Sequence, residues 1–176
     1  MKVTSDPVII LAKHTDTEAL AVISRQTFID TYASVNTPEN MQDYLSTHFS
    51  DAATVKQLAE PGTQFYLVEL DRKIIGYLKL NSGKAQTDLQ HANTFEIERI
   101  YVLSEFKGKG IGKLLVNKAI ALAKQNNADY LWLGVWEHNL PALAFYTKLG
   151  FIEFNRHIFK LGDDDQTDLM MKLELN

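Results

Sequence analysis

The chain has 176 residues, of which 45% are hydrophobic and 23% charged, so it can bury a core of the size found in one domain. We therefore expect a single domain over residues 1–176. The chain has no cysteine, which excludes disulfide frameworks, zinc–thiolate sites and thiol nucleophiles. Its 18 Lys and Arg residues against 22 Asp and Glu residues give a net charge of −4 and no basic surface for nucleic acid.

The chain also lacks the signals of membrane proteins and of metal sites. No apolar run approaches the roughly 18 residues that cross a bilayer, and the start, MKVTSDPVIILAKHTD, is too polar for a signal peptide. The five histidines show no H-x-H or H-x-x-x-H spacing. We expect a soluble, cytoplasmic protein that binds no metal, no membrane and no nucleic acid.

Short strands and capped helices make up the first half of the chain. A strand over 8–13 precedes a Thr15-x-x-Glu18 capping box and an amphipathic helix that runs to about Tyr32. Thr37-Pro38 starts further helical structure, because Pro is favoured at the first helical position. This helical structure is expected to divide into two short helices near 50–51 and to end at Pro61-Gly62. A hairpin follows, with strands over 65–70 and 74–80 and a turn at 71–73.

Strands and helices alternate in the second half. After a polar loop over 81–93, a strand is expected over 95–102, and the apolar residues of 111–123 share one helical face. This order predicts an α/β fold with a central mixed sheet. The remaining elements are a strand over 130–135, a helix over 141–149 stopped by Gly150, a strand over 151–159 and a final strand after 162–165.

The most informative stretch is Ile100-Tyr-Val-Leu-Ser-Glu-Phe-Lys-Gly-Lys-Gly-Ile-Gly-Lys113, in which a strand runs through a glycine loop into a helix. Glycines let the backbone approach a ligand closely, and a helix N-terminus attracts anions. The loop is not a P-loop, because Leu114 follows Gly112-Lys113, and Lys113 breaks the G-x-G-x-x-G dinucleotide pattern. The pattern favours a pyrophosphate site, and the alternative is a flexible turn rich in lysine.

Two motifs carry a family resemblance. Lys107-Gly-Lys-Gly110-Ile-Gly112 resembles the (Arg/Gln)-x-x-Gly-x-(Gly/Ala) signature of GNAT acetyltransferases, with Lys107 in place of the usual Arg or Gln. The run from Asn139 to Phe151 is similar to the family's N-x-x-A-x-x-x-Y-x-x-x-G-F unit. The resemblance implies a GNAT fold: a mixed, mostly antiparallel sheet with helices on both faces, whose two central strands splay apart around acetyl-CoA.

The resemblance also implies which residues bind acetyl-CoA. Backbone groups of the strand before the loop would hold the pantetheine arm, and the glycine loop would hold the pyrophosphate. Asn139 would cap the following helix and bond the pantetheine, while Lys113 and Lys148 either reach phosphates or are solvated charges. The expected cofactor residues are Ile100, Tyr101, Val102, Lys107, Gly108, Lys109, Gly110, Ile111, Gly112, Lys113, Asn139 and Lys148.

The chemistry of amine acetylation suggests two catalytic side chains. A primary amine has a pKa of about 10.4, so a base must take its proton before it attacks the thioester. Glu98 is our first choice and Glu96 the second, because a strand's period of two places both on one face; Glu98 could instead pair with a neighbouring cation. The resemblance implies that Tyr146 protonates the departing thiolate, and a strand N–H such as that of Val102 could stabilise the oxyanion.

A finer resemblance concerns the acceptor. The stretches 96–102, 132–139 and 162–168 are similar to the bacterial spermidine/spermine N-acetyltransferase branch, which implies a polyamine substrate. The alternatives are another amine, such as a protein N-terminus, a lysine or an aminoglycoside, or a non-catalytic acyl-CoA sensor. Homodimers are common in the family, but the sequence does not give the oligomeric state.

Overall fold

The computed structural model describes residues 6–88, 93–162 and 164–175, and its strands join one sheet. The strands are β1 (Val8–Leu11), β2 (Thr63–Leu70), β3 (Lys73–Ser82), β4 (Thr94–Val102), β5 (Tyr130–Trp136), β6 (Ile152–Leu161) and β7 (Asp164–Glu174). Their order in space is β1-β2-β3-β4-β5-β7-β6, and β4 and β5 run parallel while the other neighbours run antiparallel. The predicted mixed, mostly antiparallel sheet is confirmed.

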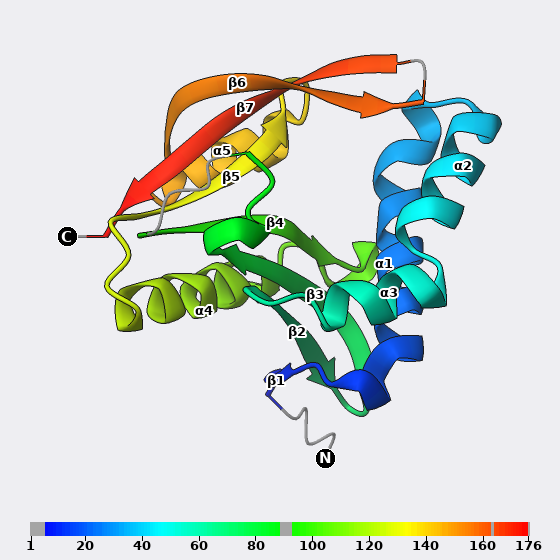
Figure 1. Cartoon of the computed structure of the whole chain (residues 1–176), viewed down its shortest axis with the longest axis horizontal. Coiled ribbons are helices and arrows are strands. Elements are labelled where there is room, and N and C mark those ends of the chain that lie inside the picture. Colours follow the sequence, from blue (N-terminus) through cyan, green and yellow to red (C-terminus); the bar gives the residue numbers. More distant parts are fainter. Residues whose placement is uncertain (1–5, 89–92, 163, 176) are drawn as a thin grey trace.

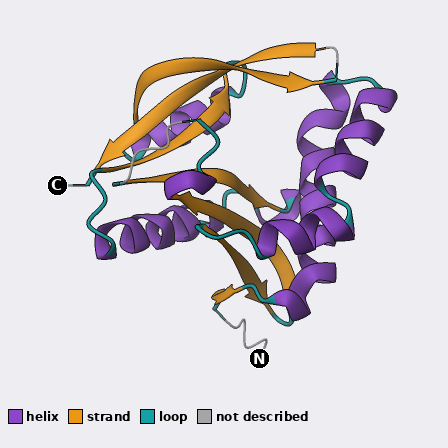
Figure 2. Cartoon of the chain, viewed as in Figure 1, coloured by secondary structure: helices purple, strands orange, loops and turns teal. Residues whose placement is uncertain are grey.

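Helices cover both faces of this sheet (Figures 1 and 2). One group packs against β2, β3 and β4, and consists of the first three helices of the chain. The other packs on the opposite face, where α4 contacts β3, β4 and β5. The helices are α1 (Thr17–Tyr32), α2 (Pro38–His48), α3 (Asp51–Leu58), α4 (Ile111–Gln125) and α5 (Leu140–Lys148). None of the helices in these residues has both the length and the apolar character needed to cross a bilayer.

Side-chain caps start the helices α2, α3 and α5. Thr37 accepts a hydrogen bond from the Asn40 N–H at 3.2 Å to begin α2, as predicted, and Ser50 begins α3 in the same way. The predicted capping box at Thr15 is wrong. A 3₁₀ turn over His14–Asp16 precedes α1 instead, because the Asp16 carboxylate accepts from the Lys13 N–H and closes this tighter turn.

The strands alternate their side chains between two cores. Leu78, Ile97 and Leu133 face α4 and α5 in the larger core. Leu67, Tyr77 and Tyr101 face α1 on the other side. Four residues of the predicted α4 face, Ile111, Leu115, Ala119 and Ala123, are buried together with Val116. Leu114 and Leu122, which were also predicted on this face, are only partly buried.

A β-bulge interrupts β4 at Glu98. Lys79 of β3 pairs with Arg99, whereas the next residue, Leu80, pairs with Ile97, so Glu98 is the extra residue. The bulge shifts the alternation by one position. Ile97 and Ile100 therefore both face the larger core, while Glu98 and Arg99 both lie on the α1 face.

The parallel strands stay paired for only part of their length. Residues 94–97 of β4 pair with 130–133 of β5, ending at Ile97 and Leu133. Beyond this point β4 remains paired with β3, and β5 remains paired with β7. We call this parting of the two strands the β4–β5 splay, and it places a gap in the middle of the sheet.

Candidate active site

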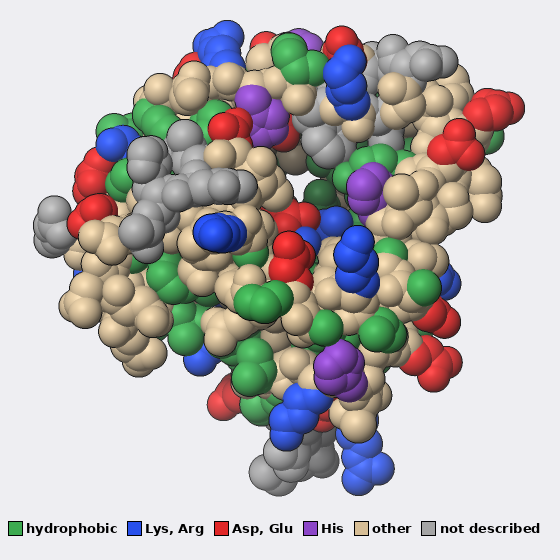
Figure 3. Space-filling view, in the orientation of Figure 1, with side chains coloured by type: hydrophobic (Ala, Val, Ile, Leu, Met, Phe, Trp, Pro, Cys, Tyr) green, Lys and Arg blue, Asp and Glu red, His purple; other side chains and the backbone are tan. Residues whose placement is uncertain are grey.

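A cavity of about 670 Å³ occupies the β4–β5 splay and passes from one face of the sheet to the other. Its walls come from β4, β5, the glycine loop and α5, with Tyr32 of α1 and Asp168 of β7 on the α1 face. The space-filling view shows the molecule hollowed between the β6–β7 pair and the helices, with acidic and basic side chains inside the hollow (Figure 3). A ligand in this cavity could reach groups on both faces of the sheet.

The glycine loop at one end of the cavity has the geometry of an anion site. Gly108 and Gly110 have φ values of +76° and +83°, which side chains other than glycine rarely adopt. A Cβ at either position would have nothing within 4 Å, so the space above the loop is open. Gly110 is the N-cap of α4, and the first N–H groups of that helix therefore point toward the cavity opening.

Close packing holds α5 beside this loop. A Cβ on Gly112 would lie 3.4 Å from the Phe145 ring, so the glycine lets the two helices approach. Asn139 caps α5 by accepting a hydrogen bond from the Ala142 N–H at 3.3 Å, as predicted, and it also lines the cavity. Gly112 and Asn139 thus position the glycine loop and α5 as two walls of one site.

The structure brings together most of the residues that the sequence predicted for a cofactor. Ten of them line the cavity: Ile100, Tyr101, Val102, Lys107, Gly108, Gly110, Gly112, Lys113, Asn139 and Lys148. Two point elsewhere. The Lys109 Nζ lies 5.0 Å from the centre of the Phe106 ring, and the Ile111 side chain is 5% exposed within the larger core.

Tyr146 also lines the cavity, from α5. Its ring packs edge-on against Phe145 and Phe151, which fixes its orientation. Burial raises the pKa of Tyr146 above its usual value, so its hydroxyl is protonated at neutral pH and can act as a proton donor.

Glu98 lines the cavity within a network of charges. Its carboxylate contacts the Lys79 Nζ at 2.5 Å and the Arg99 guanidinium at 3.4 Å, and Asn81 donates to it at 2.7 Å. Burial alone would raise the pKa of Glu98, but the two cations outweigh burial and hold the pKa below its usual value. Glu98 is therefore an ionised and weakly basic carboxylate, and its role as the base stays a prediction.

Glu96 lies beside Glu98 on the same face, as predicted, because Asn81 also donates to it at 3.2 Å. Burial raises the pKa of Glu96, while hydrogen bonds from the Thr87 hydroxyl and N–H oppose that rise. Glu96 is buried in the sheet and is not among the residues that line the cavity.

Asp168 was not among the site residues that the sequence suggested. It lies on β7 between Trp136 of β5 and His157 of β6, with 16% of its side chain exposed. Burial raises its pKa to about 6, against the opposing effect of His157. One signal was present in the sequence: a glycine inside a strand, Gly134, often marks a place where another group approaches closely.

Comparisons with known proteins show which family this chain is similar to. The model of the Acetyltransferase (GNAT) family matches residues 26–151. An uncharacterized N-acetyltransferase in the pepI 3′ region of Lactobacillus delbrueckii subsp. lactis is 39% identical over 167 residues, covering 95% of this chain and 96% of that protein. The chain belongs to the GNAT acetyltransferase family.

Other acetyltransferases are similar to this chain in sequence or in fold. The N-alpha-acetyltransferase of Sulfurisphaera tokodaii is 28% identical over 151 residues, covering 80% of this chain and 86% of that protein. The crystal structure of the PaiA N-acetyltransferase of Thermoplasma acidophilum in complex with coenzyme A superposes with a TM-score of 0.79 at 23% identity, covering 97% and 99% of the two chains. Among the described residues of this GNAT chain, no three His, Asp or Glu side chains gather as metal ligands.

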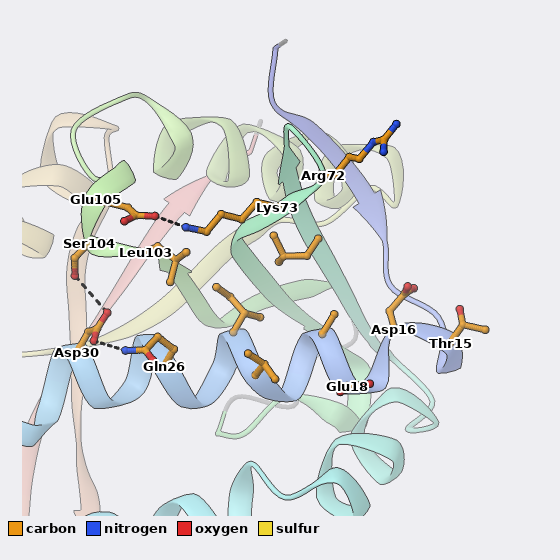
Figure 4. Close-up of a pocket in the computed structure, with 14 residues that line it drawn as sticks. Thr15, Asp16, Glu18, Gln26, Asp30, Arg72, Lys73, Leu103, Ser104 and Glu105 are labelled. Carbon is orange, nitrogen blue, oxygen red and sulfur yellow. Dashed lines mark hydrogen bonds and ion pairs between the residues drawn. The ribbon is translucent and has the colours of Figure 1, made fainter. Parts of the chain in front are cut away.

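A second hollow of about 850 Å³ lies between α1, the start of β3 and the segment after β4 (Figure 4). Five of its polar side chains are paired with one another. Asp30 accepts from Gln26 at 2.8 Å and from Ser104 at 3.4 Å, and Lys73 pairs with Glu105. These contacts join α1 to the segment that leads into the glycine loop of this GNAT fold, outside the β4–β5 splay.

The charge network predicts a large loss of stability in Glu98→Gln. The neutral amide leaves Lys79 and Arg99 without their shared carboxylate, and removing one partner of a buried ion pair costs about 3–5 kcal/mol. Urea denaturation measures the free energy of unfolding. The matched control is Asp51→Asn, whose exposed pair with Arg25 should contribute less than about 1 kcal/mol. Equal small losses in both variants would contradict the structural role of Glu98.

Proposed function

We propose that this protein is an acetyl-CoA-dependent N-acetyltransferase that moves an acetyl group onto a primary amine by direct attack. One observation carries the proposal: a single cavity crosses the sheet at the β4–β5 splay. Its α4–α5 side presents an anion-binding loop and three lysines, Lys107, Lys113 and Lys148. Its α1 side presents the carboxylates of Glu98 and Asp168. An anionic donor and a cationic acceptor could therefore meet at the gap.

The α4–α5 side suits acetyl-CoA. The loop N–H groups and the α4 N-terminus fit a pyrophosphate, and lysines at the rim add positive charge. The edges of β4 and β5 that lose each other's hydrogen bonds can bond an amide-bearing arm between them. The coenzyme A complex of the similar PaiA structure supports the assignment. Bound acetyl-CoA would supply the activated acetyl thioester.

The residues of this chain would then bind, orient and move protons. Asn139 would hold the arm while it caps α5, and the Tyr146 hydroxyl would protonate the departing sulfur. A carboxylate on the α1 face would bind the ammonium group of the acceptor. Glu98 is ion-paired there, so it would contribute negative charge more readily than it would accept a proton.

We propose a polyamine such as spermidine or spermine as the acceptor. Negative charge and aromatic rings attract ammonium groups, and Tyr32, Tyr101 and Trp136 line the cavity beside Asp168. The Gln166 side chain of β7 donates to Asn36, which follows α1, at 3.5 Å, so this hydrogen bond bridges β7 and the segment after α1. This bridge favours a slender, linear amine. A flexible protein N-terminus is the second candidate, since one relative is an N-alpha-acetyltransferase.

An amine panel tests the proposed function. Spermidine, spermine, putrescine, lysine, a peptide N-terminus and an aminoglycoside are each incubated with acetyl-CoA, and released thiol is measured. We expect turnover with spermidine or spermine. Turnover with the peptide alone would replace the polyamine by a protein N-terminus. Binding of coenzyme A without turnover of any amine would favour an acyl-CoA sensor.

Tyr146→Phe should lower kcat by about 100-fold, because general acid catalysis contributes 10²–10⁴-fold and the phenyl ring keeps the packing. The affinity for coenzyme A should change little. Tyr130→Phe is the control, since Tyr130 lies at the other end of β5 beside Phe154. A kcat for Tyr146→Phe within twofold of the control would remove the hydroxyl from the mechanism.

Gly110→Ala should weaken coenzyme A binding by about tenfold, because a left-handed alanine costs 1–2 kcal/mol and the loop must change shape to relieve it. Calorimetric titration gives the Kd. Gly83→Ala is the matched control. Its φ is +55° and its Cβ would also meet nothing within 4 Å, but it lies outside the cavity. If the two variants are destabilised to a similar extent and bind coenzyme A with the same Kd, the pyrophosphate assignment is contradicted.

A further inference from the structure

Two carboxylates flank the β4–β5 splay on the α1 face, and their surroundings differ. Glu98 is the first residue of β4 beyond the last pair with β5. Gly134 is the first residue of β5 beyond that pair, and a Cβ there would lie 3.3 Å from Asp168 Oδ2. The absence of a side chain at Gly134 therefore lets the Asp168 carboxylate lie against β5 at the edge of the gap.

The same glycine admits His157 behind Asp168. A Cβ on Gly134 would lie 3.4 Å from His157 Cε1. The His157 Nε2 lies 3.9 Å from Asp168 Oδ2, and the His157 Nδ1 lies 3.5 Å from Asp88 Oδ2. Asp88 is 42% exposed at its side chain. The His157 imidazole therefore lies between two carboxylates at ion-pair distances, and its Nδ1 makes no hydrogen bond to either of them.

We propose that Asp168 is the catalytic base of this enzyme, which binds the acceptor ammonium, takes its proton and then releases that proton to solvent. This assignment rests on the proposed function and goes further by naming the acceptor-side residue. Proton transfer to Asp168 leaves a neutral amine, whose nitrogen forms the C–N bond as the C–S bond breaks. The thiolate takes a proton from the Tyr146 hydroxyl. The new amide nitrogen then loses its second proton, which restores the Tyr146 hydroxyl. One proton reaches the sulfur and one leaves to solvent.

The electrostatics of the two carboxylates separate their roles. When their surroundings give two nearby carboxylates different pKa values, the two commonly have different functions. The cations Lys79 and Arg99 hold the pKa of Glu98 low, whereas burial raises the pKa of Asp168 to about 6, close to the pH at which a base works well. Among the residues that the structure describes, the charged or titratable groups facing Asp168 are His157 on β6 and Tyr32 on α1. Its β5 neighbours, Gly134 and Trp136, carry no charge.

This assignment predicts a specific pH profile. Below about pH 6, Asp168 is protonated and cannot accept a proton, so wild-type kcat should rise with pH through an inflection near 6. Asp168→Asn should lower kcat at pH 7.5 by about 100-fold and remove that inflection. His157→Gln removes the imidazole beside Asp168 and should lower kcat by a smaller factor than Asp168→Asn does. The amine that turns over fastest in the panel serves as substrate.

Two controls make the result specific. Asp165→Asn alters an exposed carboxylate at the start of β7, paired with Lys160 at 3.0 Å, and should leave both kcat and the inflection unchanged. Stabilisation by coenzyme A in a thermal melt should be equal in wild type and Asp168→Asn, which shows that the variant folds and keeps the donor site. Glu98→Gln should retain the inflection in the fraction that folds.

Several outcomes would overturn the assignment. An unchanged inflection in Asp168→Asn would do so, even if KM rose, because the carboxylate would then only bind the ammonium. Loss of the inflection in Glu98→Gln instead would make Glu98 the base. Wild-type protein that binds coenzyme A but acetylates no amine would overturn the proposed function itself, and with it the role of Asp168.

Discussion

The pairing of β4 with β5 stops after four residue pairs, although both strands continue. Buried backbone N–H and C=O groups in the middle of a sheet need partners, so a parting of strands there is costly unless a ligand or solvent satisfies them. Each strand keeps its outer neighbour, β3 or β7, which limits the loss to the two edges that face the gap. The glycine loop, α5 and the acidic side chains of the α1 face are all arranged around this gap.

The bulge at Glu98 connects the gap with the charges beside it. In a regular strand with strict alternation, Arg99 would share the face of Ile97, which belongs to the apolar core beneath α4. With the bulge, Arg99 lies over the Phe49 ring at 4.6 Å and shares Gln57 with Lys79. Two cations and one carboxylate then remain on the α1 face next to the gap. These two cations keep Glu98 ionised, which favours a structural role for this carboxylate.

The sequence was sufficient for elements whose signals are local. The cap at Thr37, the glycine stop at Gly150 with φ +93°, and the helix face starting at Ile111 depend on a few neighbouring residues, and the structure confirms them. The glycine loop could be predicted for the same reason. The predicted capping box at Thr15 was wrong because a competing local hydrogen bond, from the Lys13 N–H to the Asp16 carboxylate, closes a 3₁₀ turn.

The proposed acceptor side could not be found in this way, because its residues meet only through strand order. Asp168 reaches the gap because β7 inserts between β5 and β6, which no spacing in the sequence reveals. A strand pattern read with a strict period of two also misses the bulge, and so leaves Arg99 on the wrong face. The two halves of the site thus differ in kind. The proposed donor side consists of contiguous motifs on a strand, a loop and a helix, whereas the proposed acceptor side is assembled from β4, β7 and α1. The specificity of the acceptor side could therefore change without altering the donor motifs.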